Sequence, residues 1–321
     1  MSVSVGFISL GCAKNLVDSQ VMAGYLKAGR IELAASPEAA DVILINTCSF
    51  IEAAREEAAE AILGACAHKA RGGCRAVVVA GCMVQRYRKR MEAAFPDVDA
   101  FLGIDELEKV GDIVAKAARG RRCGVVAAAG DARKVYNPGY PTLLFTGGPF
   151  AYLKIADGCD HRCAYCAIPN IRGRFRSRAP DDIAREAESM VRAGVREISL
   201  ISQDSLLYGA DFAAGRPQIA PLLRRLDAIE GDFWLRVLYG YPAGVTDEVL
   251  DVLNASRHLC KYLDLPIQHS HPDVLRAMNR APAVQATEGL AARLRQAVPG
   301  IVLRTTCLVG FPCETEARFE H

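Results

Sequence analysis

Three cysteines in the segment DGCDHRCAYC have the residue type and the spacing to bind a metal cluster. Cys159, Cys163 and Cys166 fall within one short stretch, and no fourth cysteine follows in the same loop. Thiolates are soft ligands that suit iron–sulfur clusters and zinc. Three thiolates on a four-iron cluster leave one iron without a protein ligand, and that iron could bind a substrate or cofactor directly.

Two other interpretations of these cysteines stay open, a zinc site and a chance group of core residues. Structural zinc usually takes four ligands in paired spacing, which this segment lacks. His161 lies between the cysteines, where a fourth ligand would be cramped. The missing fourth cysteine therefore favours an open iron–sulfur cluster.

A second set of cysteines is spread over 70 residues of the N-terminal part. Cys12, Cys48 and Cys82 each end a predicted strand, in ISLGC, INTC and VAGC. Because neighbouring parallel strands bring their carboxyl ends to one edge of a sheet, the three thiols are expected to converge there. The alternative is that they are small residues at tight turns.

The elements that must position these cysteines alternate along the chain. Predicted strands at 3–12, 41–48 and 75–82 alternate with predicted helices at 15–29, 50–70 and 85–95. This alternation indicates an α/β fold with a parallel sheet covered on both faces, of the flavodoxin or Rossmann kind.

A segment dense in Pro and Gly, 137–149, is predicted to link two domains, 1–136 and 150–321. A second series of five βα repeats follows. Its first strand, AYLKIADGC, leads into the Cys159 loop, and a helix is predicted over 180–194 because it begins with Pro180 and Asp181 and stops at Gly194. The chain stops where a fifth helix should begin.

Composition narrows the class of protein. Formal net charge is only +2, half of the 321 residues are hydrophobic, and the apolar runs are too short to span a bilayer. There is no basic leader, so the 12 cysteines indicate a reducing compartment rather than a disulfide scaffold. A cytoplasmic protein without membrane contact is expected.

The spacing of Cys159, Cys163 and Cys166, with Tyr165 before the last cysteine, resembles the signature of radical S-adenosylmethionine (SAM) enzymes. The resemblance implies that SAM chelates the open iron of a [4Fe–4S] cluster. It also implies that an electron from an external donor cleaves SAM to a 5′-deoxyadenosyl radical. The cofactor then carries the chemistry, and the protein holds it and excludes water.

The segments SLGCAKNLVDSQ, INTCSFIEAAREEA and VAGCMVQRY closely resemble the N-terminal domain of the methylthiotransferases, and YLKIADGCDHRCAYCAIPNIRGRFRSR continues the match. The resemblance implies an incomplete radical-SAM (β/α)6 partial barrel after the first domain. It also implies two [4Fe–4S] clusters with three Cys ligands each, the first on Cys12, Cys48 and Cys82. The two trios must then face each other across one cavity.

Two branches of that family compete. The residues after Cys12 and Cys48, the stretches RGRFRSR and CKYLDLPIQH, and LRTTCLVGFPCETE resemble the branch that modifies a small-subunit ribosomal protein. The implied reaction places a methylthio group on the β-carbon of an aspartate, by a monomer that acts on or off the ribosome. The alternatives are a methylthiotransferase of transfer RNA adenosine and a non-catalytic iron–sulfur or zinc protein.

Further site residues follow from the same resemblance. Tyr165, Gln203 with Asp204, Gln268 and Arg304 are expected to line the SAM pocket, and Gly310 to let the backbone approach the cofactor; for the polar residues, ordinary strand-end positions are the alternative. The basic loop Arg172–Arg178 is expected to contact the aspartate carboxylate or ribosomal RNA phosphate, or to be a solvated loop.

The chain departs from the family pattern in two places. Cys313 stands where the family usually has glycine, and a side chain there could crowd a tight turn. Relatives continue through a sixth strand and a small β-rich, TRAM-like nucleic-acid-binding domain. A truncated chain with an incomplete barrel and an exposed strand edge is therefore expected.

Overall fold

The computed structural model describes residues 3–125, 134, 142–145, 147–280 and 289–321. The chain divides into two compact units, residues 1–145 with 167–174, and residues 146–166 with 175–321. The segment that directly follows Cys166 thus belongs to the first unit. Residues 137–141 and 146 of the predicted linker lie outside the described residues, and the predicted domain limits stay a prediction.

The first unit is built on a parallel sheet of six strands in the order β2-β1-β3-β4-β5-β6. The strands are β1 (Ser4–Ser9), β2 (Glu32–Leu33), β3 (Val42–Thr47), β4 (Ala76–Gly81), β5 (Ala100–Leu102) and β6 (Cys123–Val125). Every residue of β3 and β4 is buried, because helices cover both faces of these central strands. The predicted parallel α/β fold is confirmed.

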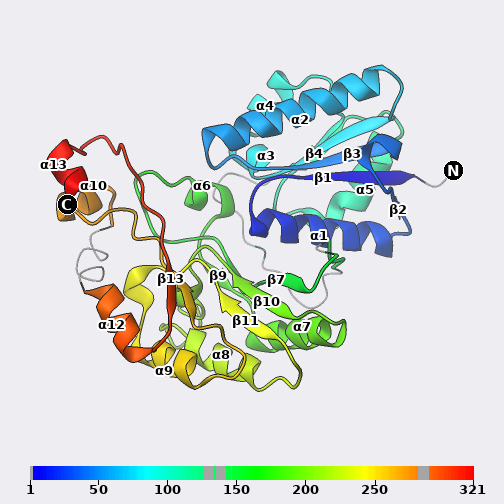
Figure 1. The fold of residues 1–321 in the computed structure, drawn as a ribbon. Helices are drawn as coiled ribbons and strands as arrows, with labels where there is room; N and C mark the ends of the chain where they lie inside the picture. Colours follow the sequence, from blue (N-terminus) through cyan, green and yellow to red (C-terminus); the bar gives the residue numbers. More distant parts are fainter. Residues whose placement is uncertain (1–2, 126–133, 135–141, 146, 281–288) are drawn as a thin grey trace. The chain divides into compact units, whose positions relative to one another are not determined.

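Two apolar cores, one on each face, hold this sheet (Figure 1). On one face, α1 (Ala13–Ala28) and α5 (Val110–Ala117) pack on side chains such as Leu44 and Val78. On the other, α2 (Glu52–Ala70), α3 (Cys82–Tyr87) and α4 (Lys89–Ala94) pack on Ile45 and Val79. Alternate residues of a strand point to opposite faces, so each strand feeds both cores.

The helix predicted over 85–95 is wrong in one respect. It is broken at Arg88, whose φ of 41° lies in the left-handed region, so α3 ends at Tyr87 and α4 begins at Lys89. No glycine or proline marks this break in the sequence.

The second unit contains three small sheets. Strands β7 (Phe150–Lys154), β10 (Glu197–Ile201) and β11 (Trp234–Val237) form a parallel sheet in the order β11-β10-β7. Strands β12 (Tyr262–Asp264) and β13 (Val302–Arg304) pair in parallel, and β8 (Ala156–Asp157) pairs antiparallel with β9 (Arg176–Ser177). A parallel bridge between Leu235 and Leu259 joins β11 to the chain before β12.

Helices follow these strands in turn (Figure 1). They are α7 (Pro180–Arg192), α8 (Ile219–Asp227), α9 (Asp247–Ala255), α10 (Pro272–Ala277), α12 (Leu290–Ala297) and α13 (Glu316–Glu320), whereas α6 (Ile168–Arg172) belongs to the first unit. Single 3-10 turns lie at Pro37–Ala39, Leu107–Lys109, Ser205–Leu207 and Pro242–Gly244. Helix α7 begins at Pro180 as predicted, and its acidic first turn suits the helix dipole.

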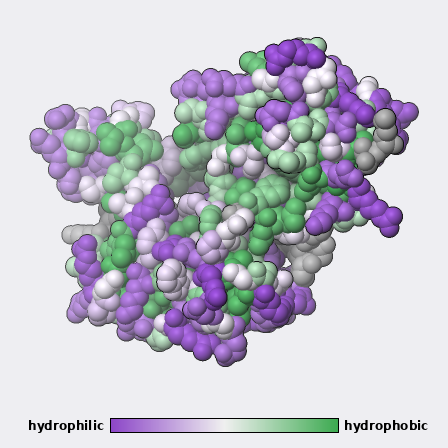
Figure 2. Space-filling model, turned by 45° about the vertical axis from the view of Figure 1, so that its right-hand side comes forward, coloured by the Kyte–Doolittle hydropathy of each residue, from purple (hydrophilic) through white to green (hydrophobic). Residues whose placement is uncertain are grey.

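Hydrophilic and hydrophobic residues are interspersed on the face that Figure 2 shows. No helix within the described ranges is long and apolar enough to cross a membrane.

Candidate functional site

The first cysteine trio stands at one edge of the six-stranded sheet. Cys12 and Cys48 follow β1 and β3, and Cys82 follows β4; these three strands are neighbours. Gly11 lies against Cys48, because a Cβ built on Gly11 would be 2.6 Å from the Cys48 Cβ and 3.1 Å from its Sγ. The structure thus brings the three thiols to the same strand ends, and their role as ligands stays a prediction.

The electrostatic surroundings of this trio are uneven. Burial raises the pKa of Cys82 to about 11; the neighbouring Arg172 opposes this rise, and the Cys12 and Cys48 thiols add to it. Burial also disfavours ionisation of Cys12, but Lys14, Arg172 and two backbone N–H groups of α1 together lower its pKa. A thiolate at a helix N-terminus is the form that binds metal.

Buried side-chain amides fix the start of α1 to the strand ends. The Asn15 Nδ2 donates to the carbonyls of Leu10 (2.8 Å) and Thr47 (3.0 Å), and the Asn46 Nδ2 donates to the Asn15 carbonyl (2.7 Å). The Asn15 Oδ1 lies 3.6 Å from the Cys82 Sγ. This network sets where Cys12 stands relative to Cys48 and Cys82.

Arg172 reaches this site from α6. It is 1% exposed, and its Nη2 lies 2.7 Å from the Asp18 carboxylate and 3.5 Å from the Cys82 Sγ. Arg172 is therefore buried and paired with Asp18, whereas the sequence predicted that the basic loop would contact the substrate or solvent.

Arg178, at the other end of the loop, is also buried. It donates to the Lys154 carbonyl at 2.7 Å and to Glu186 at 2.6 Å in the second unit. The predicted contact with ribosomal RNA or a substrate carboxylate is therefore wrong for Arg172 and Arg178, because their guanidinium groups are enclosed with protein acceptors. Arg174 is exposed and Arg176 is half-buried.

The second trio lies on the loop after β8. The Cys166 N–H donates to the Cys163 carbonyl at 3.0 Å, which closes a tight turn between them. Burial raises the pKa of Cys159 to about 12; a backbone N–H lowers it, and Asp204 and the other two thiols raise it further. The three thiols stand within eight residues of one another in a single loop.

Two residues beside this loop, Tyr241 and Arg280, gave no signal in the sequence. The His161 ring stacks on Tyr241 with centroids 4.3 Å apart, and its Nε2 lies 2.7 Å from an Asp204 oxygen. The other Asp204 oxygen accepts the Tyr241 N–H at 3.1 Å. The Arg280 guanidinium also lies over the Tyr241 ring, 4.2 Å from the ring centroid.

The predicted SAM-pocket residues have varied surroundings. The Gln203 Nε2 donates to Asp157 at 3.2 Å, while its buried Oε1 has no partner among the described residues. Tyr165 is half-buried, with its hydroxyl 3.4 Å from Arg280. Gln268 has a left-handed φ of 70° and its N–H donates to the Thr306 carbonyl.

Arg304 and Gly310 lie farther along the same region. The Arg304 side chain is 59% exposed, with its Nη1 3.4 Å from Asp264. Gly310 has a left-handed φ of 81°, and its N–H donates to the Glu314 carboxylate. Cys313 is not among the described residues with positive φ, so a side chain fits there without backbone strain.

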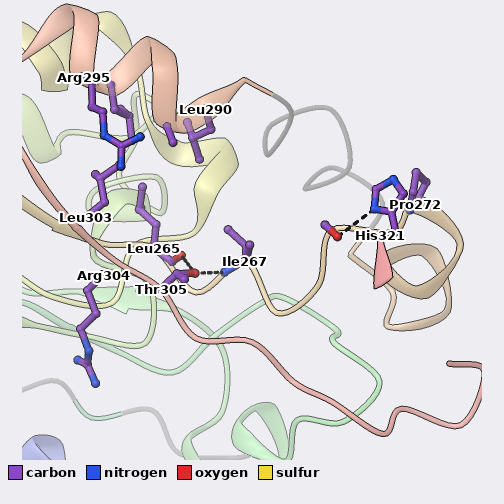
Figure 3. A pocket seen from close by; sticks show the side chains of 12 residues that line it. Leu265, Ile267, Pro272, Leu290, Arg295, Leu303, Arg304, Thr305 and His321 are labelled. Carbon is purple, nitrogen blue, oxygen red and sulfur yellow. Dashed lines mark hydrogen bonds between the residues drawn. The ribbon is translucent and has the colours of Figure 1, made fainter. Parts of the chain in front are cut away.

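A cavity of about 550 Å³ lies against β12, β13 and α12 (Figure 3). Apolar and polar residues both line it. Beside it, the Thr305 hydroxyl accepts the Ile267 N–H and donates to the Leu265 carbonyl. Arg304 is the one predicted SAM-pocket residue in its lining, and neither cysteine trio belongs to it.

Within the described parts of the chain, no three His, Cys, Asp or Glu side chains converge closely enough to hold a single metal ion. A cluster makes a different demand, because each cysteine binds a different iron atom. The donor set of each trio, three thiols without a carboxylate or imidazole completing it, suits iron–sulfur ligation better than zinc.

Comparison with known proteins agrees with these features. The model of the Radical SAM superfamily matches residues 153–321, and that of the uncharacterized protein family UPF0004 matches residues 4–103. The chain is 43% identical to the ribosomal protein uS12 methylthiotransferase RimO of Pelotomaculum thermopropionicum, covering 100% of this chain and 71% of the relative. It is 45% identical to that of Symbiobacterium thermophilum (99% and 65%) and 42% identical to that of Geobacter sulfurreducens (98% and 70%).

Solved structures share the fold. The radical SAM methyltransferase TsrM from Kitasatospora setae, with cobalamin and a [4Fe–4S] cluster bound, superposes with a TM-score of 0.69 at 16% identity, covering 99% of this chain and 71% of that one. The cobalamin-dependent radical enzyme OxsB gives a TM-score of 0.68 at 13% identity, with 99% and 51% covered. The chain belongs to the radical SAM superfamily and, within it, to the RimO family of ribosomal protein uS12 methylthiotransferases.

Proposed function

We propose that this chain transfers a methylthio group to the β-carbon of an aspartate of ribosomal protein uS12. The observation that carries this proposal is the convergence of Cys12, Cys48 and Cys82 at three adjacent strand ends. An ordinary radical SAM enzyme needs only the trio at Cys159, so a second set of thiols supports a reaction that also handles sulfur.

The six cysteines fit two clusters. Radical SAM membership gives one [4Fe–4S] cluster and SAM, which the loop of Cys159, Cys163 and Cys166 would hold. The second cluster, on the first trio, is part of the proposal, and the lowered pKa of Cys12 supports it. When bound, the loop cluster and SAM supply one-electron chemistry that can remove hydrogen from a carbon with no acidic proton.

The protein's own residues would bind and orient SAM and the substrate. The Gln203 Oε1, which has no hydrogen-bond partner among the described residues, is an acceptor for the amino group of SAM. Gly310 lets a cofactor approach the backbone, because nothing lies within 4 Å of a Cβ built on it. Arg304, with a mostly exposed guanidinium, suits a carboxylate. Arg174 and Arg176 are the members of the basic loop that can contact an acidic segment of the substrate or ribosomal RNA phosphate.

The remaining elements of the proposal follow from the substrate. A ribosomal protein and an external electron donor place the enzyme in the cytoplasm, where we expect it to work as a monomer.

The test is anaerobic reconstitution followed by iron analysis and mass spectrometry of uS12. About eight irons per chain are expected, and about four after Cys12, Cys48 and Cys82 are all changed to Ala. Cys260→Ala, outside both trios, is the control and should keep the full iron content. The wild-type chain should add a methylthio group to uS12 when SAM and reductant are present.

Three outcomes would contradict the proposal. Modification of transfer RNA adenosine instead of uS12 would assign the chain to the other branch. Zinc in place of iron would support a structural metal site, and a single cluster that survives loss of the first trio would remove the sulfur-handling site.

A further inference from the structure

Arg280 is placed next to the second trio by the way α10 ends. Asn279 adopts a left-handed φ of 56°, the Asn279 N–H donates to the Arg276 carbonyl (2.9 Å), and the Arg280 N–H donates to the Leu275 carbonyl (2.8 Å). This is the Schellman arrangement, which reverses the chain direction after a helix. It turns Arg280 back toward the loop of the second trio.

Two hydrogen bonds attach that helix end to the cysteine loop. The Ala164 N–H donates to the Met278 carbonyl at 3.0 Å, and the Asn279 Nδ2 donates to the Arg162 carbonyl at 2.7 Å. These bonds flank Cys163 on both sides. They hold the backbone at the end of α10 beside the segment that carries Cys163, and the Arg280 side chain spans the remaining distance to the sulfur.

Arg280 is 5% exposed, and its guanidinium meets no carboxylate among the described residues. Its Nη1 lies 3.6 Å from the Cys163 Sγ and 3.4 Å from the Tyr165 hydroxyl, and its Nη2 donates to the Pro266 carbonyl at 2.8 Å. Its buried Nε has no hydrogen-bond partner in the part of the chain that the structure describes. Arg172 differs, because its charge is balanced by Asp18 at 2.7 Å.

A buried cation without a counter-charge is costly, so a negative group should lie beside it. The Cys163 sulfur is the candidate, because a metal-bound cysteine is a thiolate. We propose that Arg280 is a positioning residue that places a positive charge against the second cluster and raises its reduction potential. This inference rests on the proposed function, since it requires a cluster on the second trio.

The direction follows from charge. Reduction adds one negative charge to the cluster, and a nearby cation stabilises the more negative state more strongly. Net charge and hydrogen bonds to the sulfurs are among the features that set cluster potentials. Removing the Arg280 charge should therefore make the cluster harder to reduce, while keeping the charge should largely preserve its potential.

The test is a redox titration followed by electron paramagnetic resonance, in the full chain with Cys12, Cys48 and Cys82 changed to Ala so that only the second cluster gives a signal. For Arg280→Gln, without SAM, we expect about a tenfold lower ratio of reduced to oxidised cluster at a fixed ambient potential, about 59 mV for one electron. Arg280→Lys should stay near the parent value. Arg236→Gln, which loses an ion pair with Glu197 away from the trio, is the matched control.

These measurements test the role of Arg280 independently of whether the protein modifies uS12. An unchanged potential in Arg280→Gln with full iron content overturns it. So does a shift that is seen only with SAM present, because the charge would then act on the cofactor. If Arg280→Gln binds no iron, Arg280→Lys decides: a parent-like potential supports the role of charge, and a fall of about tenfold in the reduced fraction contradicts it.

Discussion

Gly11 joins the end of β1 to Cys12, and it has no space for a side chain. Its φ is 90°, and an added Cβ would meet the Cys48 Cβ at 2.6 Å. Only glycine adopts this conformation readily, so the approach of the two cysteine segments depends on it.

If the first trio holds the cluster proposed above, Gly11→Ala is expected to reduce its iron content, because the added methyl pushes Cys48 away. Gly72→Ala is the control: its φ of 79° imposes similar backbone strain, but nothing lies within 4 Å of the added Cβ. Iron per chain after reconstitution measures the difference. Equal iron content in the two variants would mean that the Gly11–Cys48 contact does not shape the site.

At the scale of single residues, the spacing of cysteines along the chain predicted much of the candidate site. Cys159, Cys163 and Cys166 lie in one loop, so the sequence alone places them together. Arg172 was misjudged because a seven-residue segment with four arginines resembles a solvated loop. Its side chain instead pairs with Asp18, 154 positions away in the chain. No sequence pattern marked Arg280 as a site residue, because its position beside Cys163 depends on how α10 ends.

The start of α1 is fixed by side-chain amides rather than by apolar packing alone. Asn15 is fully buried, and its Nδ2 serves two strand-end carbonyls, those of Leu10 and Thr47. Both carbonyls would be left without this donor if Asn15 were removed.

Asn15→Ala should therefore destabilise the protein by about 2 kcal/mol, the cost of leaving buried partners unsatisfied. Urea unfolding of the cluster-free chain, followed by circular dichroism, measures this change. Asn254→Ala, at an exposed position in α9, should leave the midpoint nearly unchanged. A result for Asn15→Ala no larger than that of Asn254→Ala would show that the amide network is dispensable.

Strands β10 and β11 are joined across the sheet by Glu197 and Arg236, whose side chains lie 2.8 Å apart. The hydrogen bond from Arg236 holds the pKa of Glu197 below its usual range, despite the opposing effect of burial. A depressed carboxyl pKa gives stability that is present above the unfolded value and is lost as the pH falls through the folded value.

We expect the stability advantage of wild type over Glu197→Gln to disappear as the pH is lowered from about 5 to below the folded pKa, the unfolded pKa being about 4.3. Denaturant midpoints of both proteins at several pH values give this difference. Glu248→Gln, whose partner Arg224 is half-exposed, serves as a comparison. A difference that grows on acidification would have the wrong sign.

Among the elements, the strands that lead into the first cysteine trio were predicted well and the short ones were not. The sequence placed strands at 3–12, 41–48 and 75–82, and the structure has β1, β3 and β4 within these ranges. The short strands β2 and β5 were missed because two or three residues give no periodicity. The break at Arg88 was missed because no glycine or proline marks it in the sequence.

At the scale of the whole molecule, residues 167–174 belong to the first unit, although they directly follow Cys166 of the second unit. Arg172 anchors this segment through Asp18, with both side chains at most 2% exposed. Removing one partner of such a buried pair typically costs about 3 kcal/mol, because the other charge is left unpaired.

Arg172→Ala should therefore increase hydrogen exchange in α1, which carries Asp18, and leave α7 unchanged. Arg178→Ala should do the opposite, since its partner Glu186 lies on α7. Exchange measured by mass spectrometry on peptides of both helices tests the pair. The same pattern in both variants would contradict the assignment of segment 167–174.

The two cysteine trios differ in when their ligands can come together during biosynthesis. Cys159, Cys163 and Cys166 are near neighbours in the chain, so a short emerging peptide already contains all three. Cys12, Cys48 and Cys82 meet only after three strands have paired across long loops, a slower event. We expect a ribosome-bound nascent chain to capture iron at the later-encoded loop without waiting for a finished sheet, whereas loading of the earlier-encoded trio reports that its sheet has folded.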